Sequence, residues 1–222
     1  LLPVRGLLQN FSAFDIGALR AAYYTGFASG CILGPRMVRR VGYIRTFATS
    51  ASLLCSLSLV FSLFDSSLVW WLARAATGFC FATLYIVIES WLNERADNKN
   101  RGLIFSVYTT INLTVITAGQ MALTLANPQE FFLFALTAIL ISLSTVPVAM
   151  STSMAPAPLT NIRVRLRYLF ECSPVGVVGC FGVGLANGAF WTLAPVFAQH
   201  DSGDTGSVAV FMSLAVIAGA LG

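Results

Sequence analysis

The chain has 222 residues, of which 57% are hydrophobic and only 10% are charged, and its mean hydropathy is +0.79. Soluble domains carry about 25% charged residues, so this composition excludes a soluble domain that covers its surface with solvated side chains. The net charge of +4 is small, and its distribution along the chain is more informative than its size. We therefore expect an all-α membrane protein in which several helices cross the bilayer.

The apolar segments are long enough for membrane-spanning helices, which need about 20 residues each. By this criterion the chain has eight helical segments, the first and the last of them incomplete: 1–8, 15–35, 46–64, 68–91, 102–125, 130–150, 171–199 and one that begins near 206. The connectors 65–67 and 126–129 are so short that the helices they join must be antiparallel neighbours. The sequence starts without a methionine and stops within an apolar run, so we expect a fragment of a longer protein.

The longest polar connector, 151–170, is predicted to be a cytoplasmic linker between an N-terminal transmembrane bundle, 1–150, and the start of a second bundle, 171–222. Ten of the thirteen basic residues lie in every second connector: 36–45, 95–101 and 163–167. The positive-inside rule places these three connectors in the cytoplasm. A nucleic-acid site would need its arginines on one folded face beside stacking aromatic side chains, so the predicted partner is the lipid bilayer and not nucleic acid.

Glycines recur every four residues in the span 15–35, at Gly26, Gly30 and Gly34. Small residues at this spacing form one ridge along a helix and let the backbone of another helix approach closely. The spacing is compatible both with a static tight contact and with a contact that slides during gating.

The basic connector after this span reads PRMVRRVGYIR. A glycine-rich second helix followed by a basic loop with an R-x-G core resembles the signature G-x-x-x-D-R-x-G-R-R of the major facilitator superfamily, although the aspartate is absent here. The resemblance implies a gating-loop motif with seven members: Gly30, Gly34, Arg36, Arg39, Arg40, Gly42 and Arg45.

The span 68–91 extends this resemblance, because Arg74-x-x-x-Gly78 is similar to the R-x-x-x-G motif of the superfamily's fourth helix. The stretches LLPVRG and YIVIESWLNERADNKNRG are similar to a bacterial subgroup, the YcaD-like transporters. Pro-Val occurs both in LLPVRG and in LAPVFA, and the superfamily is built from parallel six-helix repeats. The resemblance implies a superfamily bundle from the end of helix 1 to the start of helix 8, in the bacterial cytoplasmic (inner) membrane.

One face of the span 68–91 contains both of its membrane charges. Arg74, Gly78, Ala82, Tyr85 and Glu89 fall within an arc of about 80° on a helical wheel. A charged side chain is costly at bilayer depth, so this face is expected to line a cavity or the bundle interior. The alternative for Arg74 is snorkelling to the lipid headgroups, and the alternative for Glu89 is a solvated position at the cytoplasmic interface.

The span 102–125 has six polar side chains on one side: Ser106, Thr109, Thr110, Thr114, Thr117 and Gln120. Hydroxyl groups can instead bond to carbonyls of their own helix. A primary amide in lipid needs a partner, which makes Gln120 the better candidate for contact with a solute.

Asn187 and Trp191 lie four residues apart in the span 171–199 and could offer a solute a hydrogen bond and a stacking face, although core packing is the alternative for Trp191. Tyr23 and Tyr24 are candidates of the same kind. Arg20, by contrast, is expected near the outer mouth of its span, in contact with water.

These features favour a secondary transporter that moves a small solute by alternating access and acts as a monomer. No Walker loop, G-x-S-x-G or H-E-x-x-H motif is present. The single histidine, His200, has no second ligand at metal spacing, and the five cysteines match neither a disulfide framework nor a C-x-x-C pair. We therefore predict no enzymatic activity, no cofactor and no metal.

Protons are the predicted coupling ion, and Glu89 is the predicted group that binds and releases them. Arg74 would hold a substrate anion or bias a carboxylate on the first helix. The alternatives are a facilitative carrier without coupling, a membrane-embedded enzyme, and a receptor that does not transport.

Overall fold

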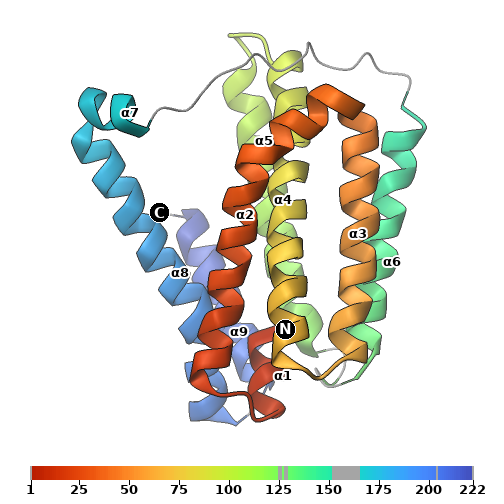
Figure 1. Ribbon diagram of the computed structural model, residues 1–222. Helices are drawn as coiled ribbons and strands as arrows, with labels where there is room; N and C mark the ends of the chain where they lie inside the picture. The colour runs from red at the N-terminus through yellow and green to blue at the C-terminus, as the bar shows by residue number, and fades with distance from the viewer. Residues whose placement is uncertain (1, 125–126, 128–129, 152–165, 204, 222) are drawn as a thin grey trace.

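The computed structural model describes residues 2–124, 127, 130–151, 166–203 and 205–221, and all regular secondary structure within them is helical (Figure 1). The elements follow in this order: α1 (Leu2–Leu8), α2 (Ala13–Val41), α3 (Tyr43–Leu63), α4 (Ser67–Arg95), α5 (Arg101–Met121), the 3₁₀ turn η1 (Ala122–Thr124), α6 (Phe132–Ala149), α7 (Leu166–Cys172), α8 (Pro174–Ser202) and α9 (Thr205–Leu221). Five of these helices, α3, α4, α5, α6 and α8, are long and apolar enough to cross a membrane.

Within the described residues, every predicted helical segment is present and in the predicted order, which confirms the all-α membrane fold. The structure adds the short helix α7, which was not predicted, and α2 is not among the five helices that are long and apolar enough to cross a membrane. The predicted span 15–35 is the least accurate, because α2 continues beyond Pro35 to Val41. The predicted span 102–125 is also too long, since α5 ends at Met121 and the chain tightens into η1. The short helix α7 overlaps the connector predicted at 151–170, while residues 152–165 of that connector lie outside the described residues. The two-bundle division remains a prediction.

The boundaries of α2 have clear local causes. At its start, the hydroxyl of Ser12 accepts a hydrogen bond from the Asp15 amide at 3.1 Å, and the Asp15 carboxylate accepts one from the Ser12 amide at 3.1 Å. This capping box satisfies two amides that the first turn leaves free. At its end, Gly42 alone joins α2 to α3 with φ +88° and ψ 166°, a conformation that only glycine adopts readily.

The closest helix pair is α2 and α4, and their backbones touch through glycine. A Cβ atom on Gly26 would lie 1.8 Å from the carbonyl oxygen of Ala75, and one on Gly30 would lie 2.7 Å from the Phe79 carbonyl oxygen. In the opposite direction, a Cβ on Gly78 would lie 2.0 Å from the carbonyl oxygen of Tyr23. The glycine ridge of α2 is therefore a tight packing surface against α4.

Three clusters of buried apolar side chains hold the bundle together. One joins α2, α3, α4 and α6 around Trp70, which is fully buried. A second, around Val87, lies nearer the other end of α3 and α4. The third joins α1 to α9 through Val4, Val208 and Met212, with Trp191 of α8 packed against it.

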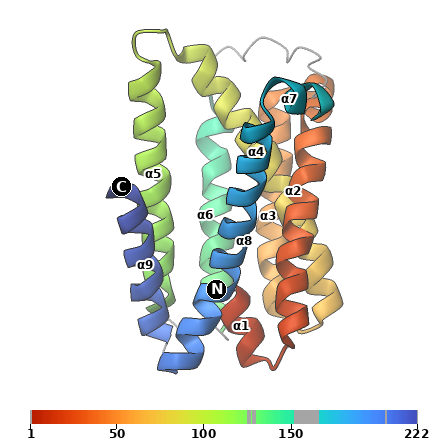
Figure 2. The same cartoon turned by 90° about the vertical axis from the view of Figure 1, so that its left-hand side faces the viewer.

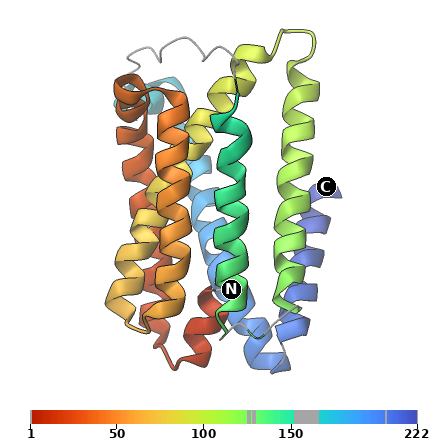
Figure 3. The same cartoon turned by 90° about the vertical axis from the view of Figure 1, so that its right-hand side faces the viewer.

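The connections α2–α3 and α4–α5 lie at one end of the bundle, together with α7 (Figures 1 and 2). The connections α1–α2, α3–α4 and α8–α9 lie at the opposite end, as the view from the other side also shows (Figure 3). The basic connectors at 36–45 and 95–101 thus share one end, which the positive-inside rule identifies as cytoplasmic. We call the opposite end the outer end.

This orientation predicts opposite labelling at two exposed positions. In a background in which the five native cysteines are changed to serine, Arg39→Cys and Ser66→Cys should react with a membrane-impermeant maleimide from opposite sides. The reason is that 39 lies at the basic end and 66 in the α3–α4 connection. Labelling of both positions from the same side of intact cells would contradict the topology.

Candidate functional site

Two arginines of the outer half of the bundle point toward a pair of tyrosines on α2. The guanidinium carbon of Arg74 on α4 lies 4.5 Å from the ring centroid of Tyr23. The guanidinium carbon of Arg20 on α2 lies 5.8 Å from the ring centroid of Tyr24. The two tyrosine rings are themselves 5.5 Å apart in an edge-to-face arrangement. Each guanidinium is thus held against an aromatic ring, a cation–π contact.

The spacing of Arg74 and Gly78 has a structural explanation. Gly78 lies one helical turn after Arg74, and its missing side chain lets the backbone of α2 touch α4 at Tyr23. That contact brings the Tyr23 ring to the Arg74 guanidinium. The glycine of the R-x-x-x-G motif therefore positions the aromatic partner of the arginine.

Arg20 connects the first bundle to α8. Its Nε atom donates a hydrogen bond to Oγ1 of Thr192 at 3.0 Å, and that hydroxyl donates to the carbonyl of Gly188 at 2.6 Å. The sequence predicts Arg20 at the outer mouth in contact with water, and the structure places it, half-buried, on the wall of a cavity in the outer half of the bundle. Its bond to α8 was not predicted, since Thr192 lies 172 residues farther along the chain.

The two arginines line a cavity of about 380 Å³ in the outer half of the bundle. Arg20, Arg74, Phe81 and Trp191 also line an adjoining cavity of about 440 Å³, which includes Tyr23 and Tyr24. Most of the remaining wall of the first cavity is apolar: Leu2, Pro3, Val4, Leu54, Phe61, Phe134, Ile141, Pro195, Val208 and Met212. No carboxylate is among the described residues that line either cavity.

Most polar groups on the cavity wall are satisfied within the protein. The hydroxyls of Ser58, Thr77 and Thr137 donate to the backbone carbonyls of Phe134, Ala73 and Leu133. Among the described residues, the side-chain amide of Gln120 and the guanidinium of Arg74 have no such hydrogen-bond partner. These two groups, together with the Nη groups of Arg20, are available to bind a solute.

The structure brings together five of the predicted site residues: Arg74, Gln120, Trp191, Tyr23 and Tyr24. The hydroxyls of α5 bond to carbonyls of their own helix, as the alternative interpretation proposed; Thr109, for example, donates to Phe105 at 2.9 Å. Gln120 is the member of that polar stripe that reaches the first cavity.

Glu89 and Asn187 lie away from this group. Both side chains are exposed, and neither lines the cavities around Arg20 and Arg74. On the α4 face that contains Arg74 and Glu89, only Arg74 faces the cavity, because Gly78 and Ala82 pack against α2 while Tyr85 and Glu89 are exposed.

The predicted connector 36–45 is helical: residues 36–41 belong to α2 and 43–45 to α3, and only Gly42 lies between the two helices. Arg36, Arg39, Arg40 and Arg45 are all exposed, and within the described residues none of them forms an ion pair. Arg36 donates to the Ile32 carbonyl of its own helix at 3.1 Å. A gating role for this motif stays a prediction.

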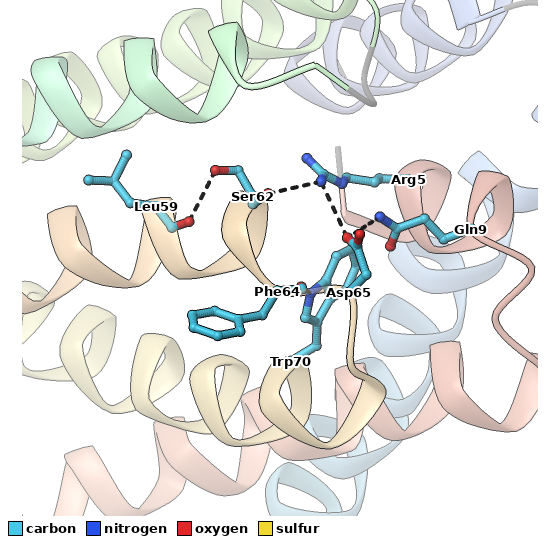
Figure 4. A network of polar contacts seen from close by, with 7 residues as sticks. All are labelled: Arg5, Gln9, Leu59, Ser62, Phe64, Asp65 and Trp70. Atoms are coloured by element: carbon cyan, nitrogen blue, oxygen red, sulfur yellow. Dashed lines mark hydrogen bonds and ion pairs between the residues drawn. The ribbon is translucent and has the colours of Figure 1, made fainter.

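The outer end has a polar network that the sequence did not indicate (Figure 4). Arg5 is 4% exposed; its Nη2 donates to the Ser62 carbonyl at 3.3 Å and lies 3.5 Å from Oδ1 of Asp65. The amide of Gln9 donates to the same carboxylate oxygen. The Arg5 guanidinium carbon also lies 4.8 Å from the Phe134 ring centroid. The network ties α1 to the α3–α4 connection beside the cavity.

Comparison with known proteins identifies the family. The Major Facilitator Superfamily model matches residues 1–222. The chain is 22% identical over 228 residues to the "Uncharacterized MFS-type transporter YcaD" of Escherichia coli O6:K15:H31, and 24% identical over 230 residues to an "Uncharacterized MFS-type transporter" of Yersinia pestis (strain Pestoides F). Each alignment covers 100% of the chain and 59% of the relative.

No solved structure matches the chain significantly. The chain spans about 59% of the length of its curated relatives, and the resemblance to the YcaD-like subgroup extends along its whole length. Family membership also excludes the membrane-embedded enzyme, since this superfamily consists of transporters. The chain is a multi-pass membrane protein that belongs to the Major Facilitator Superfamily.

Proposed function

We propose that the chain forms part of a secondary transporter that binds a small solute in the cavity beside Arg20 and Arg74 and moves it by alternating access. The observation that carries this proposal is the position of the cavity. It lies between helices of the first bundle and α8 and α9, and the bond from Arg20 to Thr192 joins the two sides. Superfamily substrates bind where the two repeats meet.

The contacts at the outer end are those expected of a conformation in which the cavity is closed on the outer side. Val4 of α1 is buried against Val208 and Met212 of α9, and the polar network of Arg5 lies beside this cluster. The ties of Arg5 to Ser62 and Asp65, at 3.3 Å and 3.5 Å, are long for hydrogen bonds. Because Arg5 is buried, opening of the outer end would have to offer its guanidinium new partners or water.

Transport is tested with the full-length protein in liposomes. Radiolabelled solutes, offered one at a time as carboxylates, amines, amino acids and sugars, should include at least one that exchanges faster in proteoliposomes than in protein-free liposomes. If none of them exchanges, the transport proposal fails.

The second part of the proposal is that solute transport is coupled to the movement of protons. In the proposal an ion gradient supplies the energy of uphill transport, and the given sequence has no nucleotide-binding motif. Glu89 is the proposed coupling residue, and it is exposed in the cytoplasmic half of α4. One observation favours the facilitative alternative, namely that the described cavity wall has no carboxylate.

Glu89→Gln separates these two mechanisms, and we expect it to abolish solute-driven proton movement. Liposomes loaded with a pH-sensitive dye report proton entry when a transported solute is added on one side. The amide cannot bind a proton at this position, whereas Glu94→Gln, an exposed change near the end of α4, should leave proton entry unchanged. Solute-driven proton entry that is equal in wild type and Glu89→Gln would remove Glu89 from the mechanism. Solute exchange without any proton movement in wild type would favour the facilitative carrier.

A further inference from the structure

We propose that the cavity selects organic anions, with the substrate carboxylate bound by Arg20 and Arg74 and its apolar body packed against Phe81 and Trp191. This inference rests on the proposed transport function and adds the substrate class. It starts from the charge of the wall. Two guanidinium groups line the same two cavities, and no described wall residue is acidic.

Arginine keeps its positive charge in proteins, so these charges cannot be relieved by losing protons. Arg74 forms no ion pair with a described residue, and its contact with Tyr23 is through the ring face. A cation–π contact replaces only part of the solvation that a buried charge loses. A bound anion would therefore be favoured by both guanidinium groups.

The directions of the hydrogen-bond donors suit a carboxylate. Tyr23 and Tyr24 lie against the two guanidinium groups, and Arg20 uses its Nε atom for Thr192. The Nη groups of both arginines have no hydrogen-bond partner among the described residues. Arginine binds a carboxylate through two parallel N–H groups, and the free amide of Gln120 can donate to a further oxygen of the substrate.

The rest of the wall distinguishes an organic anion from an inorganic one. A cavity of about 380 Å³ is within the usual range for small-molecule sites. Leu54, Phe61, Phe134 and Met212 line it and cannot replace the water around phosphate or sulfate. They can pack against an apolar ring or chain, so the fitting ligand combines one carboxylate with an apolar body.

The test compares ligands of equal shape and different charge on the full-length protein in detergent. The probes are 4-nitrobenzoate, 4-nitrobenzamide and 4-nitrobenzylamine, with inorganic phosphate as the fourth. Binding is followed by quenching of tryptophan fluorescence, because Trp191 lines the cavity, and by the shift in melting temperature. We expect 4-nitrobenzoate to bind at least tenfold more tightly than each of the other three.

Variants of Arg20 and Arg74 test whether 4-nitrobenzoate binds at the proposed position. Arg20→Gln and Arg74→Gln should each weaken 4-nitrobenzoate binding at least tenfold, and the conservative Arg74→Lys should retain part of it. Lys99→Gln, which removes an exposed cation from the α4–α5 connection, should leave binding unchanged. Equal or tighter binding of the neutral or cationic probe to wild type would overturn the proposal even if the variants fail to fold. Absence of quenching and of any thermal shift by all carboxylates, 4-nitrobenzoate, benzoate and phenylacetate, would also overturn it.

The binding test and the transport assay can contradict the anion assignment and the transport function independently of each other. If amines or sugars exchange across liposomes while the carboxylates neither bind nor exchange, the transport function holds and the anion assignment is wrong. If carboxylates bind at Arg20 and Arg74 but no solute crosses the membrane, the site is an anion site and the transport proposal is wrong.

Discussion

Arg74→Ala is expected to lower the rate of solute exchange by roughly a hundredfold, equivalent to about 3 kcal/mol of activation free energy. The guanidinium lies on the cavity wall over Tyr23, and the proposed substrate carboxylate would lose one of its two cationic partners. Exchange in proteoliposomes, normalised to the amount of inserted protein, measures the effect.

Folding should survive this change. Within the described residues Arg74 forms no hydrogen bond or ion pair that other elements depend on, so Arg74→Ala should reach the membrane at the wild-type level. Lys99→Ala is the control, because it removes an exposed cation at the cytoplasmic end and should leave exchange unchanged. A normal exchange rate in Arg74→Ala would remove Arg74 from the site.

Gly26→Ala is expected to destabilise the bundle strongly, although it adds only one methyl group. The added Cβ would lie 1.8 Å from the carbonyl oxygen of Ala75. This is a backbone atom, which cannot move away by a change of rotamer. α2 and α4 would have to separate along their tightest contact. Overpacking of this kind costs about 1–3 kcal/mol and occasionally more, and we expect a cost of at least about 3 kcal/mol, because both clashing atoms belong to helix backbones.

The melting temperature of the monodisperse protein in detergent measures this loss of stability. Gly78→Ala should behave like Gly26→Ala, because its Cβ would lie 2.0 Å from the Tyr23 carbonyl oxygen in the same interface. The control is Gly17→Ala on the same helix, where nothing lies within 4 Å of the added carbon; it should be neutral or slightly stabilising, since alanine favours helix over glycine. Equal melting of Gly26→Ala and Gly17→Ala would show that α2 and α4 are not in close contact.

Much of the fold was predictable because its signals are local. The spans follow from apolar runs of membrane length, and the orientation follows from Arg36, Arg39 and Arg40 at one end of α2 and a connection without basic residues after α3. Bilayer thickness and the positive-inside bias act on each segment separately. The glycine spacing in α2 predicted a close helix contact for the same reason, since residues four apart share one face.

The residues of the cavity wall were predicted in part from the sequence. Arg74, Gln120 and Trp191 were predicted because each places a charged, amide or large aromatic side chain within an otherwise apolar span. Glu89 and Asn187 carried the same signal, yet both are exposed, since a helical wheel does not say which neighbour covers a face. The other helices decide that.

The membrane class, the spans, the orientation and the family all follow from the amino-acid sequence. Hydropathy, charge and motif spacing are properties of short segments, so they can be followed along the chain without knowledge of its partners. Three contacts required the packed helices: Gly78 presents Tyr23 to Arg74, Arg20 bonds to Thr192, and Arg5 reaches Ser62. The partners lie 172 residues apart for Arg20 and 57 for Arg5, and such contacts form only when packing brings distant helices together.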